Sequence, residues 1–165
     1  MAFQHIPVLF HETIDSLRIR PDGVYIDGTA GGGGHSQAIL DRLQTGLLLS
    51  IDQDPDAIAV VTKRFEGNPC SLVRQANFAD MARVAAEAGI SRADGVLLDI
   101  GVSSYQLDTP ERGFSYHSDA PLDMRMSQSG PTAADLVNPL PASELASILT
   151  RFGEEKSARA IAQGI

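Results

Sequence analysis

Residues 24–36 read Val-Tyr-Ile-Asp-Gly-Thr-Ala-Gly-Gly-Gly-Gly-His-Ser, and they give the clearest indication of the fold class. Its first four residues follow a Pro-Asp-Gly turn at 21–23 and predict a buried β-strand over 24–27. The four consecutive glycines that follow allow a tight turn and let a ligand approach the backbone without a Cβ in the way. From residue 36 to 43 the apolar residues recur at helical spacing. The stretch therefore predicts a strand, a glycine-rich loop and a helix in succession.

The alternation of strand and helix continues as far as residue 101. Three further buried strands are predicted from apolar runs at residues 47–51, 71–73 and 96–100. Asp54 is expected to cap a helix that has Pro55 at its first position, and Asn77 is expected to cap the next helix. Four such alternations are typical of an α/β fold of Rossmann-like type, with a parallel sheet covered by helices on both faces.

The overall composition limits the classes of function. The chain has 165 residues, 43% hydrophobic and 21% charged, as expected of a globular domain with a real core. We expect no membrane span, because no apolar run approaches the ~20 residues that cross a bilayer. The N-terminus does not resemble a signal peptide and Cys70 is the single cysteine, so a cytoplasmic location is expected. The net charge of -8 by itself favours a small-molecule ligand over RNA.

The glycine-rich loop is the first candidate binding site, because ligands of open parallel sheets bind at the carboxyl ends of the strands. A Walker A phosphate loop is excluded, since Gly34 is followed by His35 and not by lysine. A dinucleotide fingerprint fits weakly, with Ser36 in place of the third glycine. Asp52 directly follows the second strand and could accept both hydroxyls of a ribose. This arrangement suits NAD and S-adenosylmethionine (SAM) alike, and close helix packing is the plainer alternative for the glycines.

Two residues near the other strands are further candidates. Phe78 follows the third strand and could pack on an adenine ring or simply begin the apolar stripe of the next helix. Asp99 lies inside the apolar run 96–100, where we interpret it as a buried acid. A buried acid is costly unless it is paired, so a functional role is favoured, facing either the cationic end of SAM or an amine substrate.

At several motifs the sequence resembles the MraW (RsmH) family of rRNA methyltransferases, over essentially the whole chain. These motifs are residues 5–9, 27–29 with 32–36, 51–55, 97–104, 106–108, 111–115, 121–126 and 153–155. The resemblance implies a class I SAM-dependent methyltransferase fold. It also implies methylation of the N4 amino group of a cytidine in the 16S rRNA of the small ribosomal subunit.

The resemblance also implies particular residues and domains. The SAM-binding residues would be Gly33, Gly34, His35, Asp52, Phe78, Asp99 and Gln106. Asp99 is also the candidate catalytic residue, because its carboxylate could accept a hydrogen bond from the substrate amine. Residues 1–105 would be the N-terminal part of the SAM-binding domain, and residues 106–165 the beginning of an inserted helical domain that recognises the substrate. Members of the family are longer, so the chain is expected to be their first half. No metal is expected, because the histidines show no ligand spacing.

Several alternatives stay open at this point. The chain could be an NAD-linked oxidoreductase, or a truncated module that binds SAM without catalysis. Arg112 and Arg125 could contact RNA phosphate or form ion pairs with Asp108 or Asp123. The fourth strand would present an open apolar edge, and such edges promote self-association, so a homodimer is a candidate partner.

Overall fold

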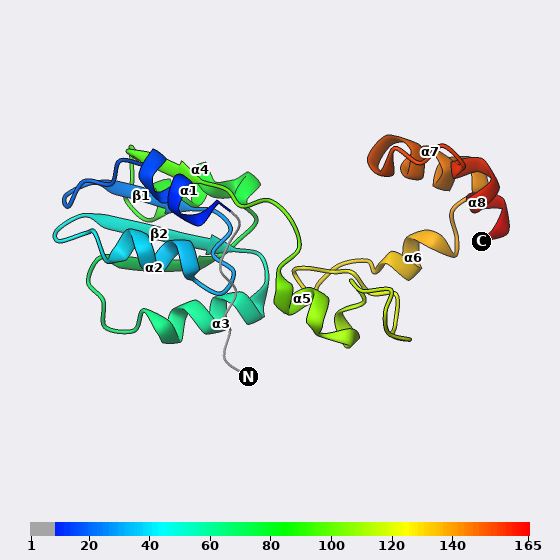
Figure 1. The fold of residues 1–165 in the computed structure, drawn as a ribbon, viewed down its shortest axis with the longest axis horizontal. Coiled ribbons are helices and arrows are strands. Elements are labelled where there is room, and N and C mark those ends of the chain that lie inside the picture. The colour runs from blue at the N-terminus through cyan, green and yellow to red at the C-terminus, as the bar shows by residue number, and fades with distance from the viewer. Residues whose placement is uncertain (1–8) are drawn as a thin grey trace. The chain divides into compact units, whose positions relative to one another are not determined.

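The structure is a computed structural model that describes residues 9–165 (Figure 1), so residues 5–8 of the first motif lie outside it. Its strands are β1 Val24–Asp27, β2 Leu47–Asp52, β3 Ser71–Gln75 and β4 Gly95–Leu97. Its helices are α1 Phe10–Ser16, α2 Gly34–Leu40, α3 Pro55–Arg64, α4 Met81–Glu87, α5 Ser104–Asp108, α6 Ala133–Val137, α7 Ala142–Gly153 and α8 Ala158–Gly164, with short 3-10 turns η1 Phe78–Asp80 and η2 Pro110–Arg112.

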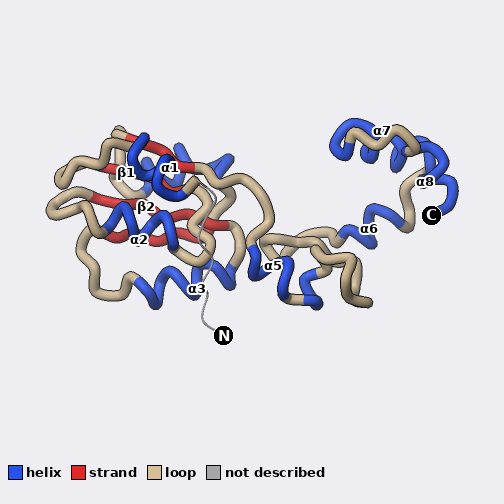
Figure 2. Tube along the Cα trace, in the orientation of Figure 1, coloured by secondary structure: helices blue, strands red, loops and turns tan. Residues whose placement is uncertain are grey.

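The four strands form one parallel sheet, drawn in red in Figure 2. Their order in the sheet is β3-β2-β1-β4. Tyr25 of β1 pairs with Leu48 of β2 and with Gly95 of β4, so β1 lies inside the sheet. Each of the first three strands is followed by a segment that returns the chain to the same end of the sheet, as parallel pairing requires. The carboxyl ends of β1, β2 and β4 therefore lie at one edge.

Helices cover both faces of the sheet, which confirms the predicted α/β architecture. On one face Tyr25 and Leu48 pack with apolar residues of α1, α2 and α3, among them Val61. On the other face Leu49 and Ile51 pack with α4. The predicted caps are present as well: the Asp54 side chain accepts a hydrogen bond from a backbone N–H in the first turn of α3, and Asn77 does the same for η1.

The fourth strand differs from the prediction. A strand was expected over 96–100, but β4 ends at Leu97. Within residues 9–165 β4 pairs with β1 alone, and its other edge has no neighbour. Val96 in this edge strand is 47% exposed, and Ile100, which lies beyond the end of β4, is 72% exposed. An apolar run alone does not predict burial when the strand lies at the edge of the sheet.

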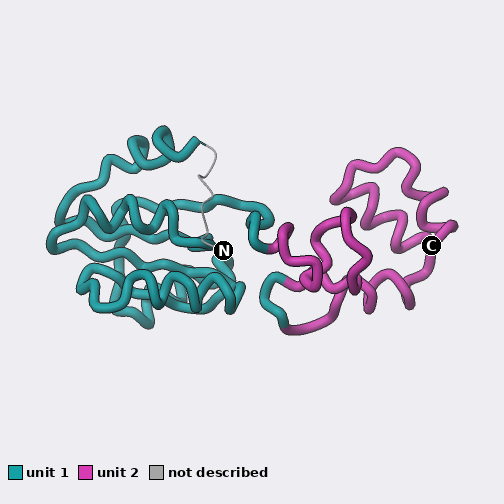
Figure 3. Tube along the Cα trace, turned by 60° about the horizontal axis from the view of Figure 1, so that its bottom comes forward, with its two compact units in different colours: residues 1–105, 126–128 teal, residues 106–125, 129–165 magenta. Residues whose placement is uncertain are grey.

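The chain forms two compact units (Figure 3). The first contains the residues up to 105 together with 126–128, and the second contains 106–125 and 129–165. The second unit has a small apolar core, in which Leu145 and Ala146 of α7 pack against Ala158 and Ala162 of α8. None of the helices within residues 9–165 has the length and apolar character needed to cross a membrane.

Candidate functional site

A buried polar cluster lies beneath the glycine-rich loop. Asp27, the last residue of β1, is fully buried. Its Oδ2 accepts a hydrogen bond from Ser36 Oγ at 2.7 Å, and its Oδ1 accepts one from the Thr29 N–H at 3.1 Å. Ser36 Oγ also lies 3.0 Å from Ser50 Oγ of β2. Burial raises the pKa of the Asp27 carboxyl, and the hydrogen bonds from Ser36 and Thr29 offset part of that effect.

Sequence reasoning did not include Asp27 among the site residues. The available signal was an acid that ends an apolar strand directly before a glycine-rich loop, with a serine nine residues later. The structure shows that this acid organises the loop from below, because it fixes both Thr29 in the loop and Ser36 in α2.

The loop itself is bound to the ends of the two strands that flank β1. The Gly28 N–H donates to the Leu97 carbonyl of β4, and the Ala30 N–H donates to the Ile51 carbonyl of β2, each at 2.9 Å. A Cβ at Gly28 would lie 2.6 Å from Leu98 Cδ2 and 3.2 Å from Phe78 Cβ. A Cβ at position 28 would therefore require the Leu98 side chain to move aside and would crowd the Phe78 Cβ.

Two of the four glycines at 31–34, Gly33 and Gly31, have different roles. Gly33 adopts φ 80°, and a Cβ there would lie 3.0 Å from the Phe65 ring and 3.1 Å from Val61. This glycine permits close packing against α3, which was the plainer alternative. Gly31 adopts φ 49°, and among residues 9–165 a Cβ there would have one neighbour within 4 Å, the Thr29 carbonyl at 3.9 Å. The backbone at Gly31 is accordingly open enough for a ligand to approach.

Asp52 connects the end of β2 to this loop. Its Oδ2 accepts a hydrogen bond from the Gly31 N–H at 2.8 Å, and its Oδ1 accepts one from the Asp54 N–H at 2.9 Å. The side chain is half-buried, and burial raises the pKa of its carboxyl. Each carboxylate oxygen has two lone pairs, so Asp52 can accept further hydrogen bonds from a ligand hydroxyl while it holds the loop.

The interpretation of Asp99 as a buried acid is wrong. Asp99 lies two residues beyond the end of β4, and its side chain is 59% exposed. Its backbone N–H donates to Thr29 Oγ1 at 2.7 Å, and its Oδ2 lies 3.9 Å from His35 Nδ1. Asp99 is therefore tied to the glycine-rich loop through its backbone, while its carboxylate remains accessible.

His35, at the start of α2, is only 6% exposed. Its ring stacks on Phe10 of α1 with 5.4 Å between the ring centroids. Within residues 9–165 its buried Nε2 has no hydrogen-bond partner. A buried nitrogen without a partner costs about 1–3 kcal/mol, so a polar group supplied by a ligand would stabilise this arrangement.

The remaining predicted residues lie in different places. Phe78 is half-buried beside Gly28 and is absent from both apolar clusters that flank the sheet. Gln106 is buried in α5 and belongs to the second unit. Arg125 forms an ion pair with Asp123 at 2.6 Å, as the alternative to phosphate contact suggested, and its donated hydrogen bonds lower the pKa of the Asp123 carboxyl. The first unit thus holds six of the seven predicted cofactor residues: Gly33, Gly34, His35, Asp52, Phe78 and Asp99.

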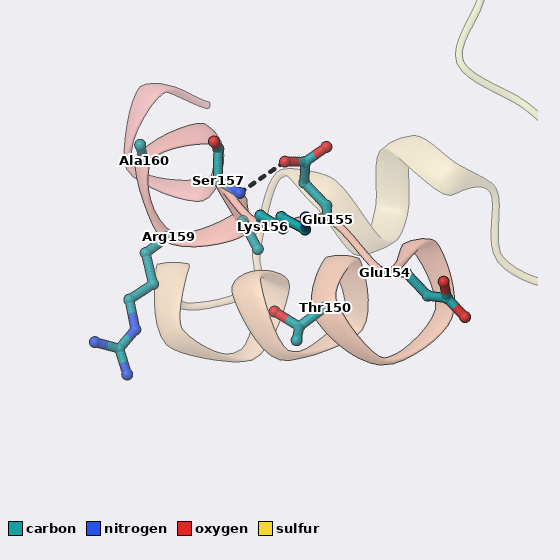
Figure 4. A pocket seen from close by; sticks show the side chains of 8 residues that line it. Thr150, Glu154, Glu155, Lys156, Ser157, Arg159 and Ala160 are labelled. Atoms are coloured by element: carbon teal, nitrogen blue, oxygen red, sulfur yellow. Dashed lines mark hydrogen bonds between the residues drawn. The ribbon is translucent and has the colours of Figure 1, made fainter.

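An open hollow of about 660 Å³ lies in the second unit, at the junction of α7 and α8 (Figure 4). It is lined by Thr150 and residues 154–160, and the Ser157 N–H donates to Glu155 Oε1 across its rim at 2.7 Å. It contains none of the predicted site residues. In the described part of the chain, no three His, Cys, Asp or Glu side chains are grouped in a way that could hold a metal ion.

Comparisons with known proteins identify a family and several relatives that match the sequence of the chain. The model of the MraW methylase family matches residues 2–165. Proteins named ribosomal RNA small subunit methyltransferase H are 52% identical to the chain in Heliobacterium modesticaldum and in Symbiobacterium thermophilum, over 100% of the chain in each case. The protein of that name in Deinococcus radiodurans is 50% identical over 99% of the chain.

The chain spans about half the length of these curated relatives: 54%, 53% and 51%, respectively. Among solved structures, an rRNA methylase from Streptococcus thermophilus covers 50% of the chain at 14% identity, and the chain covers 50% of it, with a TM-score of 0.40. A structural similarity this low adds nothing to the comparison of sequences.

Proposed function

The chain belongs to the MraW methylase family. On that premise we propose that it binds SAM and transfers the methyl group to the N4 amino group of a cytidine in the 16S rRNA of the small ribosomal subunit. The observation that carries this proposal is the Asp52 carboxylate, held against the Gly31 N–H at the edge of the sheet where the glycine-rich loop lies. Relatives that match the chain closely are named as methyltransferases of small-subunit rRNA.

The residues at this edge fit an adenosine-containing methyl donor. Asp52 would accept hydrogen bonds from the ribose hydroxyls, and the bare backbone around Gly31 leaves room for the donor. Phe78 beside Gly28 offers an aromatic face to an adenine. We propose Gly33, Gly34 and Gln106 as further SAM contacts, on the family resemblance.

The chemistry requires a nucleophile to be oriented. When bound, SAM supplies a methyl group that is activated by its sulfonium. The cytosine amino group is a weak nucleophile because its lone pair is delocalised into the ring. The accessible Asp99 carboxylate would accept a hydrogen bond from this amino group, together with backbone carbonyls at 101–103, and so localise the lone pair on nitrogen. The protein must also hold the amino group in line with the methyl group, and it does so mainly by positioning the two reactants.

Three further assignments follow from the same proposal. We propose that residues 1–105 are the N-terminal part of the SAM-binding domain and that residues 106–165 begin the helical domain that recognises the substrate. A ribosomal substrate places the protein in the cytoplasm. The open edge of β4, where Val96 is exposed, would let two copies of the chain associate.

The proposal is tested by incubating the chain with methyl-labelled SAM and small ribosomal subunits that lack the modification, with a full-length relative as the positive control. The expected result is label in one N4-methylated cytidine of 16S rRNA, and an Asp99→Ala variant should lose this transfer. Saturable binding of SAM with no transfer would indicate a non-catalytic module. Saturable binding of NADH that SAM does not displace would indicate an oxidoreductase.

A further inference from the structure

A continuous row of hydrogen bonds connects the interior of the sheet to the exposed Asp99. It begins with Ser50 Oγ, which lies 3.0 Å from Ser36 Oγ. Ser36 Oγ donates to Asp27 Oδ2 at 2.7 Å, and Asp27 Oδ1 accepts from the Thr29 N–H at 3.1 Å. Thr29 Oγ1 then accepts from the Asp99 N–H at 2.7 Å. Thr29 is thus the link between the buried acid and the accessible one.

The Thr29 hydroxyl accepts a backbone hydrogen bond just beyond the point where the regular pairing of β1 with β4 ends. The last backbone bond between β4 and the residue after β1 runs from the Gly28 N–H to the Leu97 carbonyl at 2.9 Å. Two residues further along, the Asp99 N–H bonds to the side-chain oxygen of Thr29 and not to a backbone carbonyl. The backbone of Asp99 therefore depends on the Thr29 side chain to extend its connection to β1.

The buried polar residues to which Thr29 is connected by hydrogen bonds form a rigid support. Asp27 is fully buried, and Ser36 and Ser50 are fully buried beside it. A network of this kind, satisfied by hydrogen bonds and enclosed by the core, fixes its members in one arrangement. Asp99 lies beyond the end of its strand and has an exposed side chain. The position of its backbone is therefore determined by its hydrogen bond to Thr29.

We propose that Thr29 is a positioning residue for methyl transfer: its hydroxyl fixes the backbone of Asp99 so that the Asp99 carboxylate reaches the amino group of the substrate. This inference rests on the proposed function of Asp99. Thr29 itself need not touch the donor or the substrate in this role. A displacement of a reacting group by about 1 Å can cost about 100-fold in rate, so one hydrogen bond at this point is sufficient to matter.

Two matched variants test the inference. Thr29→Val keeps the size and β-branching of the side chain but removes the acceptor, whereas Thr29→Ser keeps the acceptor. With the chain and small ribosomal subunits as substrate, Thr29→Val should lower kcat by about 10- to 100-fold. The Kd for SAM should change less than about threefold, since a positioning residue acts after binding. Thr29→Ser should restore kcat to within about threefold of the original.

Amide hydrogen exchange gives a second readout that does not depend on activity. The Asp99 N–H should exchange about tenfold faster in Thr29→Val than in the unaltered chain, while Thr29→Ser should keep its protection. The Ile26 N–H inside β1 should exchange equally in all three proteins. Loss of protection at both Asp99 and Ile26 would indicate general loosening of the sheet and overturn the inference.

The outcomes separate the inference from the proposed function. No transfer by the unaltered chain would overturn the proposed function and the inference with it. Transfer by the unaltered chain with an equal kcat in Thr29→Val would overturn the inference alone.

Discussion

Asp27 and Asp99 end closely similar stretches of sequence, yet Asp27 is buried and Asp99 is exposed. Asp27 ends the run Val-Tyr-Ile-Asp, and Asp99 ends the run Val-Leu-Leu-Asp. Asp27 is 0% exposed and accepts hydrogen bonds through both of its oxygens, whereas the Asp99 side chain is 59% exposed. The first acid organises the interior, and the second is available to a substrate.

The difference arises from the place of each strand in the sheet. β1 has β2 on one side and β4 on the other, so the end of the strand is enclosed. In the described residues β4 has β1 as its single neighbour, and its chain leaves the sheet after Leu97. For these two acids the number of neighbouring strands, more than the composition of the strand, accounts for the difference in burial, whereas Asp52 at the end of β2 is half-buried although β2 also has two neighbours.

The largest expected effect is on stability. Asp27→Ala should lower the free energy of unfolding by about 2–4 kcal/mol, because it leaves the buried Ser36 hydroxyl and the part-buried Thr29 N–H without their Asp27 acceptor. Asp99→Ala should change it by less than about 0.5 kcal/mol, since the side chain is exposed. Urea unfolding of both variants measures the difference. Equal losses of stability would show that the two acids do not differ as described.

The next effect concerns the binding of SAM. Asp52→Ala should weaken the affinity for SAM by about 10- to 100-fold in titration calorimetry, through the loss of a charged hydrogen-bond acceptor for the ribose. The exposed Glu66 provides a control of the same type, and Glu66→Ala should leave the affinity unchanged. Unchanged affinity in Asp52→Ala, in a protein that remains folded, would remove Asp52 from the site.

A smaller effect concerns the dependence of the free energy of unfolding on pH, which tests the burial of Asp27 in a second way. Burial raises the pKa of Asp27 above the ordinary aspartate value of 3.8, so the folded chain holds this proton more tightly than the unfolded chain. The stabilisation by the neutral carboxyl is fully present below pH 3.8 and is lost as the pH rises through the raised pKa. The Asp27→Asn variant carries an amide in place of the carboxyl, so it has no carboxyl proton to release.

The free energy of unfolding should therefore decline less with rising pH in Asp27→Asn than in the unaltered chain. Urea unfolding at a series of pH values upward from about 4 measures the two slopes. Because every other carboxyl is common to both proteins, their difference isolates Asp27. Parallel curves would contradict the expected role of burial at this residue.

The smallest effect concerns the free edge of β4. Val96→Lys places a charge on an exposed edge residue and should reduce self-association, measured as the apparent mass by light scattering over a range of concentrations. The free energy of unfolding should change by no more than about 0.5 kcal/mol. If the unaltered chain is a monomer at all concentrations, the proposed association at this edge is wrong.

The sequence predicted the features that depend on neighbouring residues. The run at 24–27 predicted β1 with its observed bounds, and Asp54 before Pro55 predicted the observed start of α3, since caps and turns are local. The prediction for Asp99 was wrong because burial depends on strand order, which no local pattern contains. Asp27 was missed for the same reason: its full burial depends on the strands β2 and β4 on either side of β1, although its hydrogen-bond partners Thr29 and Ser36 are close in sequence.

The hydrogen bond from the Gly31 N–H to Asp52 has a consequence for the kinetics of ligand entry. Glycine-rich segments lose more conformational entropy on ordering than other segments do. Here Asp52 and the Arg64 guanidinium, which donates to the Gly32 carbonyl at 2.9 Å, order the loop when the chain folds. A ligand therefore meets a preorganised receptor, so its association rate should be governed by diffusion and not by a slow rearrangement of the loop.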